Sequence, residues 1–292
     1  MGTKGTPLRA LQATPPWEWP QDAGATILSA LRDAQVQPSE RLLAAELGGD
    51  IVVINEELAC GLLSILRDPA EPEELRSQAA ISVGPVLESM DQTDPEIDDP
   101  DDAPISARTF EEIQETLRNL HDDPRVPAEV RRRALESSAR AQRDWHAPAV
   151  RAALASADAA WRLTAVFCMQ LVRGFEAEIL EALQSTQPEM RYEAVCAAGS
   201  WVVDGAWPLV TSLAASEKTE KGLRLAAIAA VGSIRPHQAP SVLGELVDSD
   251  DEDVAEAAAD ALALAEGDLG DEGEDEDDDN DDDKDDDNTR CH

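Results

Sequence analysis

The chain has 292 residues, of which 61 are Asp or Glu and only 24 are Lys or Arg, so its formal net charge is −37. Such an acidic surface repels phosphate backbones and anionic membranes, which argues against nucleic-acid and membrane partners. The longest stretch without a charged residue, 205–216, is shorter than the ~20 apolar residues that a membrane span needs.

The first 22 residues lack helical periodicity, and we expect them to be extended. Lys4 and Arg9 are not followed by the apolar stretch of a signal peptide, so none is expected. Trp17 and Trp19 stand in a proline-rich run and have two interpretations. They cap the apolar end of the helices that follow, or they form a linear motif that docks into a partner's groove.

Residues 23–266 repeat a pattern of two short amphipathic helices joined by a polar turn. In Glu176–Val203, apolar residues recur at helical spacing on both sides of a turn that contains Pro188. The second helix of each copy carries the same short template, an apolar residue followed by arginine and then small or apolar residues. The template position is occupied by Arg41, Arg76, Arg131, Arg162, Arg191, Arg224 and, with the arginine lost, Ala255.

The spacing of these copies predicts the architecture. Five of the six steps between template positions are 29 to 35 residues long, and the step from 76 to 131 is 55. A first helix precedes each template, at 27–31, 62–66, 113–120, 150–154, 179–183, 209–213 and 242–247. A single hairpin cannot bury its apolar face, whereas stacked hairpins share one core, so the pattern indicates a helical solenoid.

Two segments interrupt the pattern. The apolar stretch Asp50–Asn55 is predicted to be a loop, with Asn55 capping the helix that starts at Glu56. The segment Asp91–Pro104 holds seven acidic residues, three prolines and no basic residue, and it accounts for the long step. It is interpreted as a solvated loop or as an acidic lip that contacts a basic ligand.

One basic cluster stands out between Arg125 and Arg143. Arg133 and Arg140 are seven residues apart and share a helix face, so an acidic peptide or phosphoprotein site is one interpretation. The other is ion pairing within and between repeats. Trp145 and Trp201 either pack between repeats or anchor a bound peptide.

The four cysteines suit neither a zinc site nor a disulfide framework. Cys60, Cys168 and Cys196 lie in apolar helical runs and are predicted to be core residues, which indicates a reducing, cytoplasmic location. The tail 267–292 contains 15 acidic and two basic residues and is predicted to be disordered. It is either a solubilising tail or a segment that captures a basic partner or competes with an acidic ligand.

The repeated template resembles HEAT repeats, in particular the short HEAT-like repeats of the phycobilisome lyases. This resemblance implies an all-α fold, a right-handed α-solenoid of about seven hairpins over residues 23–266. It also implies that an acidic turn residue pairs with a template arginine between repeats. The candidate pairs are Asp68 with Arg76, Asp123 with Arg131 or Arg132, and Asp158 with Arg162.

No catalytic, metal or cofactor site is predicted. The sequence lacks zinc-protease, serine-hydrolase and nucleotide-binding motifs, and it lacks the His-Glu pairs that HEAT-like iron hydroxylases carry as ligands. We expect a monomeric, non-enzymatic scaffold for another protein, with acidic segments that favour a basic partner. The alternatives are a lyase-like accessory factor in bilin attachment, from the resemblance, and a DNA-binding repair protein, which the charge disfavours. Candidate partner-binding residues are Trp17, Trp19, Arg133, Arg140, Trp145 and Trp201.

Overall fold

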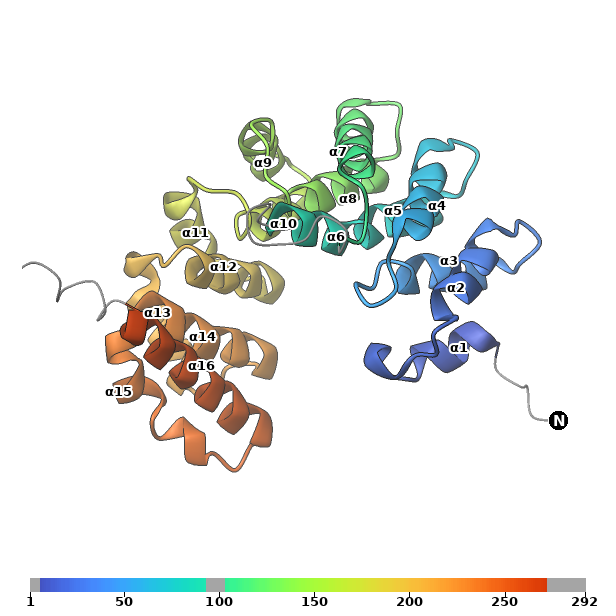
Figure 1. The fold of residues 1–292 in the computed structure, drawn as a ribbon. Coiled ribbons are helices and arrows are strands. Elements are labelled where there is room, and N and C mark those ends of the chain that lie inside the picture. The colour runs from blue at the N-terminus through green and yellow to red at the C-terminus, as the bar shows by residue number, and fades with distance from the viewer. Residues whose placement is uncertain (1–5, 93–102, 272–292) are drawn as a thin grey trace, which may run out of the picture. The chain divides into compact units, whose positions relative to one another are not determined.

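The computed structural model describes residues 6–92 and 103–271, and every regular element within these ranges is a helix. The all-α fold class predicted from the sequence is therefore confirmed for the described part of the chain. The chain divides into two compact units, unit 1 (Met1–Phe175) and unit 2 (Glu176–His292), shown in Figure 1. One continuous solenoid and its right-handed sense stay predictions.

Unit 1 contains four helical hairpins within its described residues. The pairs are α2 (Ala23–Arg32) with α3 (Pro38–Leu47), α4 (Glu56–Arg67) with α5 (Glu73–Ser82), α7 (Ala107–Asp122) with α8 (Ala128–Ser138), and α9 (His146–Leu154) with α10 (Ala159–Cys168). The second helices pack in series, α3 on α5, α5 on α8 and α8 on α10, while α2 packs on α4 and α4 on α7. The hairpins thus form two helical layers around an apolar core.

Unit 2 contains three hairpins built in the same way. They are α11 (Glu176–Ala182) with α12 (Pro188–Ser200), α13 (Trp207–Ala215) with α14 (Lys221–Ile234), and α15 (Ala239–Leu243) with α16 (Glu252–Asp271). The short 3₁₀ turns η3 (Asp204–Ala206) and η4 (Pro236–Gln238) lie between the hairpins, and η5 (Leu246–Asp248) lies between α15 and α16. In this unit α12 packs on α14 and α14 on α16. The seven predicted hairpins are all present in the described residues.

The template arginines have a shared structural role. In four hairpins the guanidinium donates to the backbone carbonyl ten residues earlier, which lies in the last turn of the first helix. These bonds join Arg41 to Leu31, Arg76 to Leu66, Arg131 to His121 and Arg224 to Ala214, with N–O distances of 2.9–3.2 Å. The last carbonyls of a helix have no partner within it and carry partial negative charge, so a buried cation satisfies them.

Of the acid–arginine pairs implied by the family resemblance, Asp68 with Arg76 is wrong. Within the described residues, Asp123 with Arg131 or Arg132 and Asp158 with Arg162 form no ion pair, although the charge of Arg131 helps to lower the pKa of Asp123. Arg76 bonds to the Leu66 carbonyl rather than to Asp68, and the Asp68 carboxylate accepts from the backbone N–H of Ala70 (2.8 Å). A pair between neighbouring hairpins does occur elsewhere. Arg41 of α3 binds Glu71 in the next hairpin's turn through two N–O distances of 2.8 and 2.9 Å.

The hairpins of unit 1 are also linked at their first helices. Asn55 caps α4 as predicted, because its side-chain oxygen accepts from the N–H groups of Glu57 and Leu58 at 3.0 Å. The adjacent Glu56 carboxylate accepts from the N–H of Ser106, the N-cap of α7, at 2.8 Å, and from the Thr109 hydroxyl. These hydrogen bonds stabilise the carboxylate and lower the pKa of Glu56.

Two glycines allow neighbouring second helices to approach closely. A Cβ at Gly49, just after α3, would lie 2.4 Å from the carbonyl oxygen of Ser82 at the end of α5. A Cβ at Gly232 of α14 would lie 2.7 Å from the carbonyl oxygen of Ala261 of α16. Both distances are too short for any side chain, so glycine is required where these backbones meet.

Several sequence predictions fail at the level of elements. The N-terminal segment is not extended, because it contains α1 (Pro7–Gln12) and the 3₁₀ turn η1 (Pro16–Glu18). An additional helix, α6 (Gly84–Gln92), fills part of the 55-residue step, and α16 continues past the expected start of the tail. The rest of the acidic insertion, 93–102, and the tail from 272 lie outside the described residues. Cys60 is exposed rather than in the core, whereas Cys168 is buried and Cys196 half-buried.

Candidate functional site

The two N-terminal tryptophans, Trp17 and Trp19, differ in burial and in hydrogen bonding. The Trp19 indole N–H donates to the carbonyl oxygens of Leu11 (3.0 Å) and Thr14 (2.9 Å), which fixes a half-buried ring against α1. Trp17 is 78 % exposed. The capping interpretation therefore applies to Trp19, while the Trp17 side chain is accessible to a partner.

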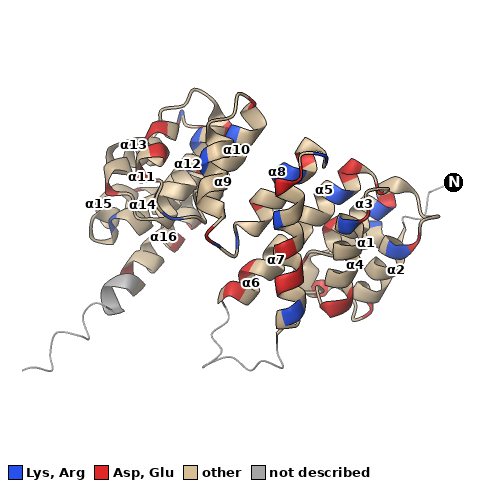
Figure 2. Cartoon of the chain, turned by 90° about the horizontal axis from the view of Figure 1, so that it is seen from above, with Lys and Arg blue, Asp and Glu red and all other residues tan. Residues whose placement is uncertain are grey.

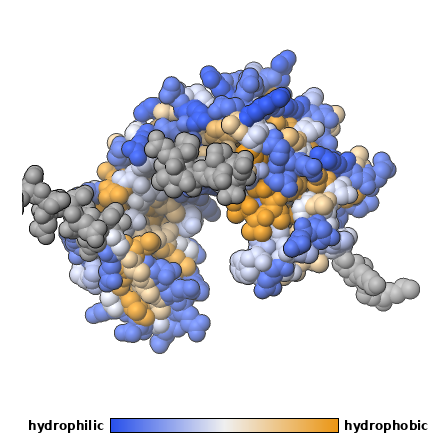
Figure 3. All heavy atoms as spheres, viewed as in Figure 1, coloured by the Kyte–Doolittle hydropathy of each residue, from blue (hydrophilic) through white to orange (hydrophobic). Residues whose placement is uncertain are grey.

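Trp19 is a wall shared by two neighbouring cavities of about 440 and 410 Å³. Their lining comes from α1 and the segment after it, α2, the end of α3, the α3–α4 loop, the start of α4, α5 and the start of α6. Its larger apolar members are Leu11, Trp19, Leu28, Leu47, Val52, Val53, Leu58 and Ile81. We call these two cavities the N-terminal groove. The exposed residues Trp17 and Ile51 are chain neighbours of the lining residues Pro16 and Val52. Figure 3 shows apolar atoms gathered over this part of unit 1.

Carboxylates surround the N-terminal groove. Glu57 lines one cavity, Glu46 and Asp50 line the other, and no Lys or Arg lines either. Glu18 follows Trp17 directly and is exposed. Among the described residues, Glu18, Glu46 and Glu57 form no ion pair, in contrast to the paired carboxylates of α8. The groove therefore combines apolar walls with a negative rim.

Sequence reasoning missed most of this groove. Val52 is 55 % exposed in the α3–α4 loop, and Ile81 is 37 % exposed on α5. The sequence feature that pointed to the groove was the apolar stretch Asp50–Asn55. It has four consecutive apolar residues in a loop, and a loop does not bury all four. Ile81 gave no signal, since it occupies an apolar position of an amphipathic helix like many buried residues.

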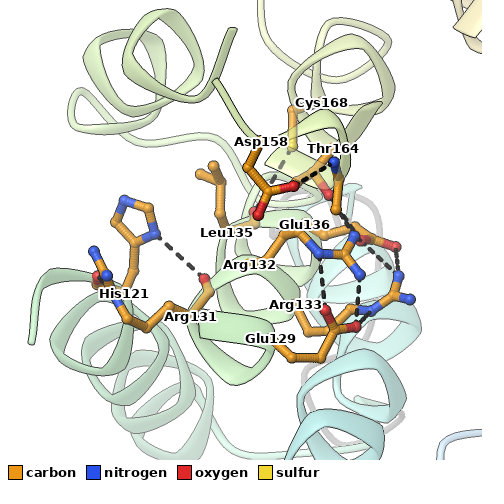
Figure 4. A network of polar contacts seen from close by, with 11 residues as sticks. His121, Glu129, Arg131, Arg132, Arg133, Leu135, Glu136, Asp158, Thr164 and Cys168 are labelled. Atoms are coloured by element: carbon orange, nitrogen blue, oxygen red, sulfur yellow. Dashed lines mark hydrogen bonds and ion pairs between the residues drawn. The ribbon is translucent and has the colours of Figure 1, made fainter. Parts of the chain in front are cut away.

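The basic cluster is neutralised by nearby acids. Arg133 donates to Glu129 (2.9 Å) and to Glu136 (2.8 Å) on the same helix, as Figure 4 shows. Arg140 pairs with Glu88 of α6 and lies 5.8 Å from the centre of the Phe167 ring. Pairing within and between repeats is thus what the structure shows, and Arg133 and Arg140 do not form an open basic patch.

Arg132 extends the same network into the next hairpin. Its guanidinium is mostly buried, donates to the Thr164 hydroxyl of α10 (2.7 Å) and pairs with Glu129 of α8 (2.5 Å), as drawn in Figure 4. Figure 2 shows basic and acidic residues at neighbouring positions along the α8 ribbon. The network stabilises the packing of α8 on α10 and leaves little free positive charge for a ligand.

Trp145 belongs to a packed aromatic cluster at the start of α9. Its ring centre is 4.0 Å from that of His146 and 5.5 Å from that of His121. His121 also lies 5.8 Å from Trp161. Trp145 lines an open cavity of about 750 Å³ as well, between α7 and the turn before α9, together with Gln114 and Arg118. The structure thus supports a packing role for Trp145 and leaves one edge accessible.

His146 is fully buried within this cluster. The backbone N–H of Arg143 donates to the Nδ1 of His146 (2.8 Å), and the Nε2–H of His146 donates to the hydroxyl of Ser138 (3.0 Å). These two bonds correspond to the neutral imidazole with its proton on Nε2. Burial lowers the pKa of His146 to about 4, and burial also lowers the pKa of His121. Both imidazoles are therefore neutral at pH 7.

Trp201 lies in unit 2, at the C-cap of α12, and is half-buried. The accessible large side chains of unit 2 are Tyr192 on α12, Val202 after it, Val247, and Leu264 on α16, which is 73 % exposed. The other predicted binding residues all belong to unit 1.

Two further structural facts bear on function. Over residues 6–92 and 103–271, no three His, Cys, Asp or Glu side chains are grouped so that they could hold a metal ion. In the same ranges, no helix is both long and apolar enough to cross a bilayer.

The fold defines an all-α protein of stacked helical hairpins. Residues 176–263, which lie in unit 2, match the family model of HEAT repeats. The hairpins of unit 1 pack in the same serial manner, outside the matched range. The comparison does not distinguish the phycobilisome-lyase type of repeat from others.

The solved structures that resemble this chain include two of low sequence identity. One is human deoxyhypusine hydroxylase in complex with glycerol, with 18 % identity and a TM-score of 0.39, over 89 % of this chain and 88 % of that one. The other is YibA of E. coli, with 14 % identity and a TM-score of 0.42, over 90 % and 99 %. No curated protein matches the sequence. At these identities and scores neither likeness bears on function.

Proposed function

We propose that this protein is a non-enzymatic scaffold that binds another protein through its helical-hairpin surface. The observation that supports this proposal best is the N-terminal groove, where two neighbouring cavities share the Trp19 wall and the exposed side chains of Val52 and Ile81 belong to their lining. Monomeric soluble proteins rarely leave contiguous apolar side chains in contact with water unless a partner covers them.

The charge of the chain favours a basic partner. A formal net charge of −37 attracts a basic protein at long range and raises the association rate, most strongly at low ionic strength. The same charge opposes nucleic acids and anionic membranes, so a protein is the partner class that we propose. The chain acts as a monomer in this proposal.

The test is cross-linking in the native cell followed by affinity capture and mass spectrometry. The full chain is compared with a chain that ends at Asp271, because this end point keeps α16 intact and removes most of the acidic tail. A basic protein captured by both chains supports a binding site on the hairpins. Capture by the full chain alone places recognition in the tail.

One control makes the result specific. A tail of reversed sequence fused after Asp271 has the same charge and length as the natural tail. It therefore distinguishes binding that depends on the tail's charge from binding that depends on its sequence. A capture that yields no enriched protein with any of the chains would contradict the scaffold proposal.

A further inference from the structure

The N-terminal groove has the features of a site for one chemical class of partner. The two cavities share Trp19 and lie on either side of it, and each has enough volume for one or two large apolar side chains. The Trp19 ring is held by two indole hydrogen bonds, to Leu11 and Thr14. Because this wall is fixed before binding, little conformational entropy is lost when a ligand packs against it.

The rim of the groove selects among apolar ligands. Glu46, Asp50 and Glu57 line the cavities without any Lys or Arg, and Glu18 lies beside the exposed Trp17. The carboxylates of Glu18, Glu46 and Glu57 form no ion pair within the described residues, although most acids of α8 are paired. A cation placed at this rim gains Coulomb attraction without breaking an existing pair.

We infer that the N-terminal groove binds a partner segment with two large apolar side chains flanked by Lys or Arg. The apolar side chains occupy the cavities on either side of Trp19, and the cations meet the carboxylates at the rim. This inference rests on the proposed scaffold function and specifies its site and its partner chemistry.

The test uses a random 16-residue peptide library displayed on phage and selected against the full chain at low salt. Enriched peptides are then synthesised, and their affinity is measured by fluorescence anisotropy. We expect the enriched sequences to combine two large apolar residues with at least two Lys or Arg. We also expect binding to weaken as salt is raised, because the rim carboxylates are exposed.

Two pairs of substitutions locate the site. The pair Val52→Gln and Ile81→Gln makes exposed apolar walls polar without changing charge, and about tenfold weaker binding is expected. The pair Glu46→Lys and Glu57→Lys reverses the rim, and a loss of at least about tenfold at low salt is expected. The matched control is Glu181→Lys with Glu256→Lys, the same charge change at exposed positions of unit 2, with less than about a twofold effect.

Circular dichroism of each variant confirms that it is folded before its affinity is interpreted. Enriched peptides without basic residues, or peptides whose affinity is the same for all variants, would overturn the inference while leaving the scaffold function intact. Enriched peptides whose sequence matches a segment of this chain would overturn the inference of a different partner protein, because they identify the partner as a second copy of this chain. If no peptide is enriched, the groove inference fails, whereas the scaffold function is judged by the cross-linking experiment alone.

Discussion

At the scale of single residues, the turn after α12 is strained. Trp201 is the C-cap and Val202 has φ +49°, a left-handed conformation that β-branched residues disfavour. The N–H of Val203 donates to the Ala198 carbonyl and the N–H of Val202 to that of Gly199, so the turn is a Schellman motif. Glycine normally occupies the position that Val202 holds.

We predict that Val202→Gly stabilises unit 2. The substitution removes the Cβ that opposes the left-handed conformation, and it loses little packing because Val202 is 54 % exposed. The expected gain in the free energy of unfolding is about 1 kcal/mol, measured by urea denaturation. Val202→Ala is the control, because it shortens the side chain but keeps the Cβ, and it should give no comparable gain. A loss of stability with glycine would contradict this account of the turn.

His146 makes the stability of unit 1 depend on pH. Its pKa is about 4 in the folded chain and ~6.5 in an unfolded one, so the unfolded chain binds a proton first as pH falls. The free energy of unfolding contributed by this group is thus fully present above pH ~6.5 and decreases toward pH 4, by roughly 2–3 kcal/mol in total. The backbone hydrogen bond with Arg143 opposes burial, whereas the charges of Arg143, His121 and Arg118 lower the pKa of His146 as burial does.

The measurement compares urea denaturation of the wild-type chain and His146→Gln at several pH values between 7 and 4.5. Glutamine offers similar hydrogen-bonding groups but does not titrate, so its stability should fall less over this range. Carboxylates titrate in both chains and cancel in the comparison. Parallel pH profiles for the two chains would show that His146 does not carry this dependence.

At the scale of elements, four of the hairpins are closed by a hydrogen bond from the template arginine, whose role the sequence pattern did not explain. The buried guanidinium of Arg76 makes two hydrogen bonds to the Leu66 carbonyl, at 3.0 and 3.2 Å, and so connects α5 to the last turn of α4. Arg191 has the same template position, yet it makes no bond of this kind to the end of α11 within the described residues.

We therefore predict that Arg76→Met is more destabilising than Arg191→Met. Methionine at position 76 leaves a buried carbonyl without a partner, which costs roughly 2–3 kcal/mol of unfolding free energy. At position 191 no such bond is lost, so a change below about 1 kcal/mol is expected. Both are measured by denaturant unfolding, and equal effects of the two substitutions would contradict a bonding role for the template arginine.

Hairpin periodicity was predictable because it depends on local apolar spacing, which the seven pairs of helices retain. The partners of the template arginines were not predictable, because every residue has a backbone carbonyl and the sequence does not mark which one accepts the bond. Nearby acidic residues such as Asp68 were the partners that the sequence suggested instead. α6 was missed because Gly84 and Pro85 at its start resemble a turn. The position of Trp19 is fixed by the carbonyls of Leu11 in α1 and Thr14 just after it. This was not predictable because α1 is too short to show a helical pattern of apolar residues.

At the scale of the whole molecule, charge and apolar surface act together. In the proposed function, the chain's net charge of −37 attracts a basic protein, but charge alone provides little specificity. The N-terminal groove provides apolar contacts in a defined place, with carboxylates that are not already neutralised. By contrast, Arg133 and Arg140 were candidates for a ligand site, and their pairing with neighbouring acids gives them a structural role.

The most direct test of this account is hydrogen–deuterium exchange of the full chain with and without the protein captured by cross-linking. We predict slower exchange on binding in two segments, the α3–α4 loop around Ile51 and Val52 and the end of α5 around Ile81. Slower exchange confined to unit 2, or to the acidic tail, would contradict the claim that the N-terminal groove is the binding surface.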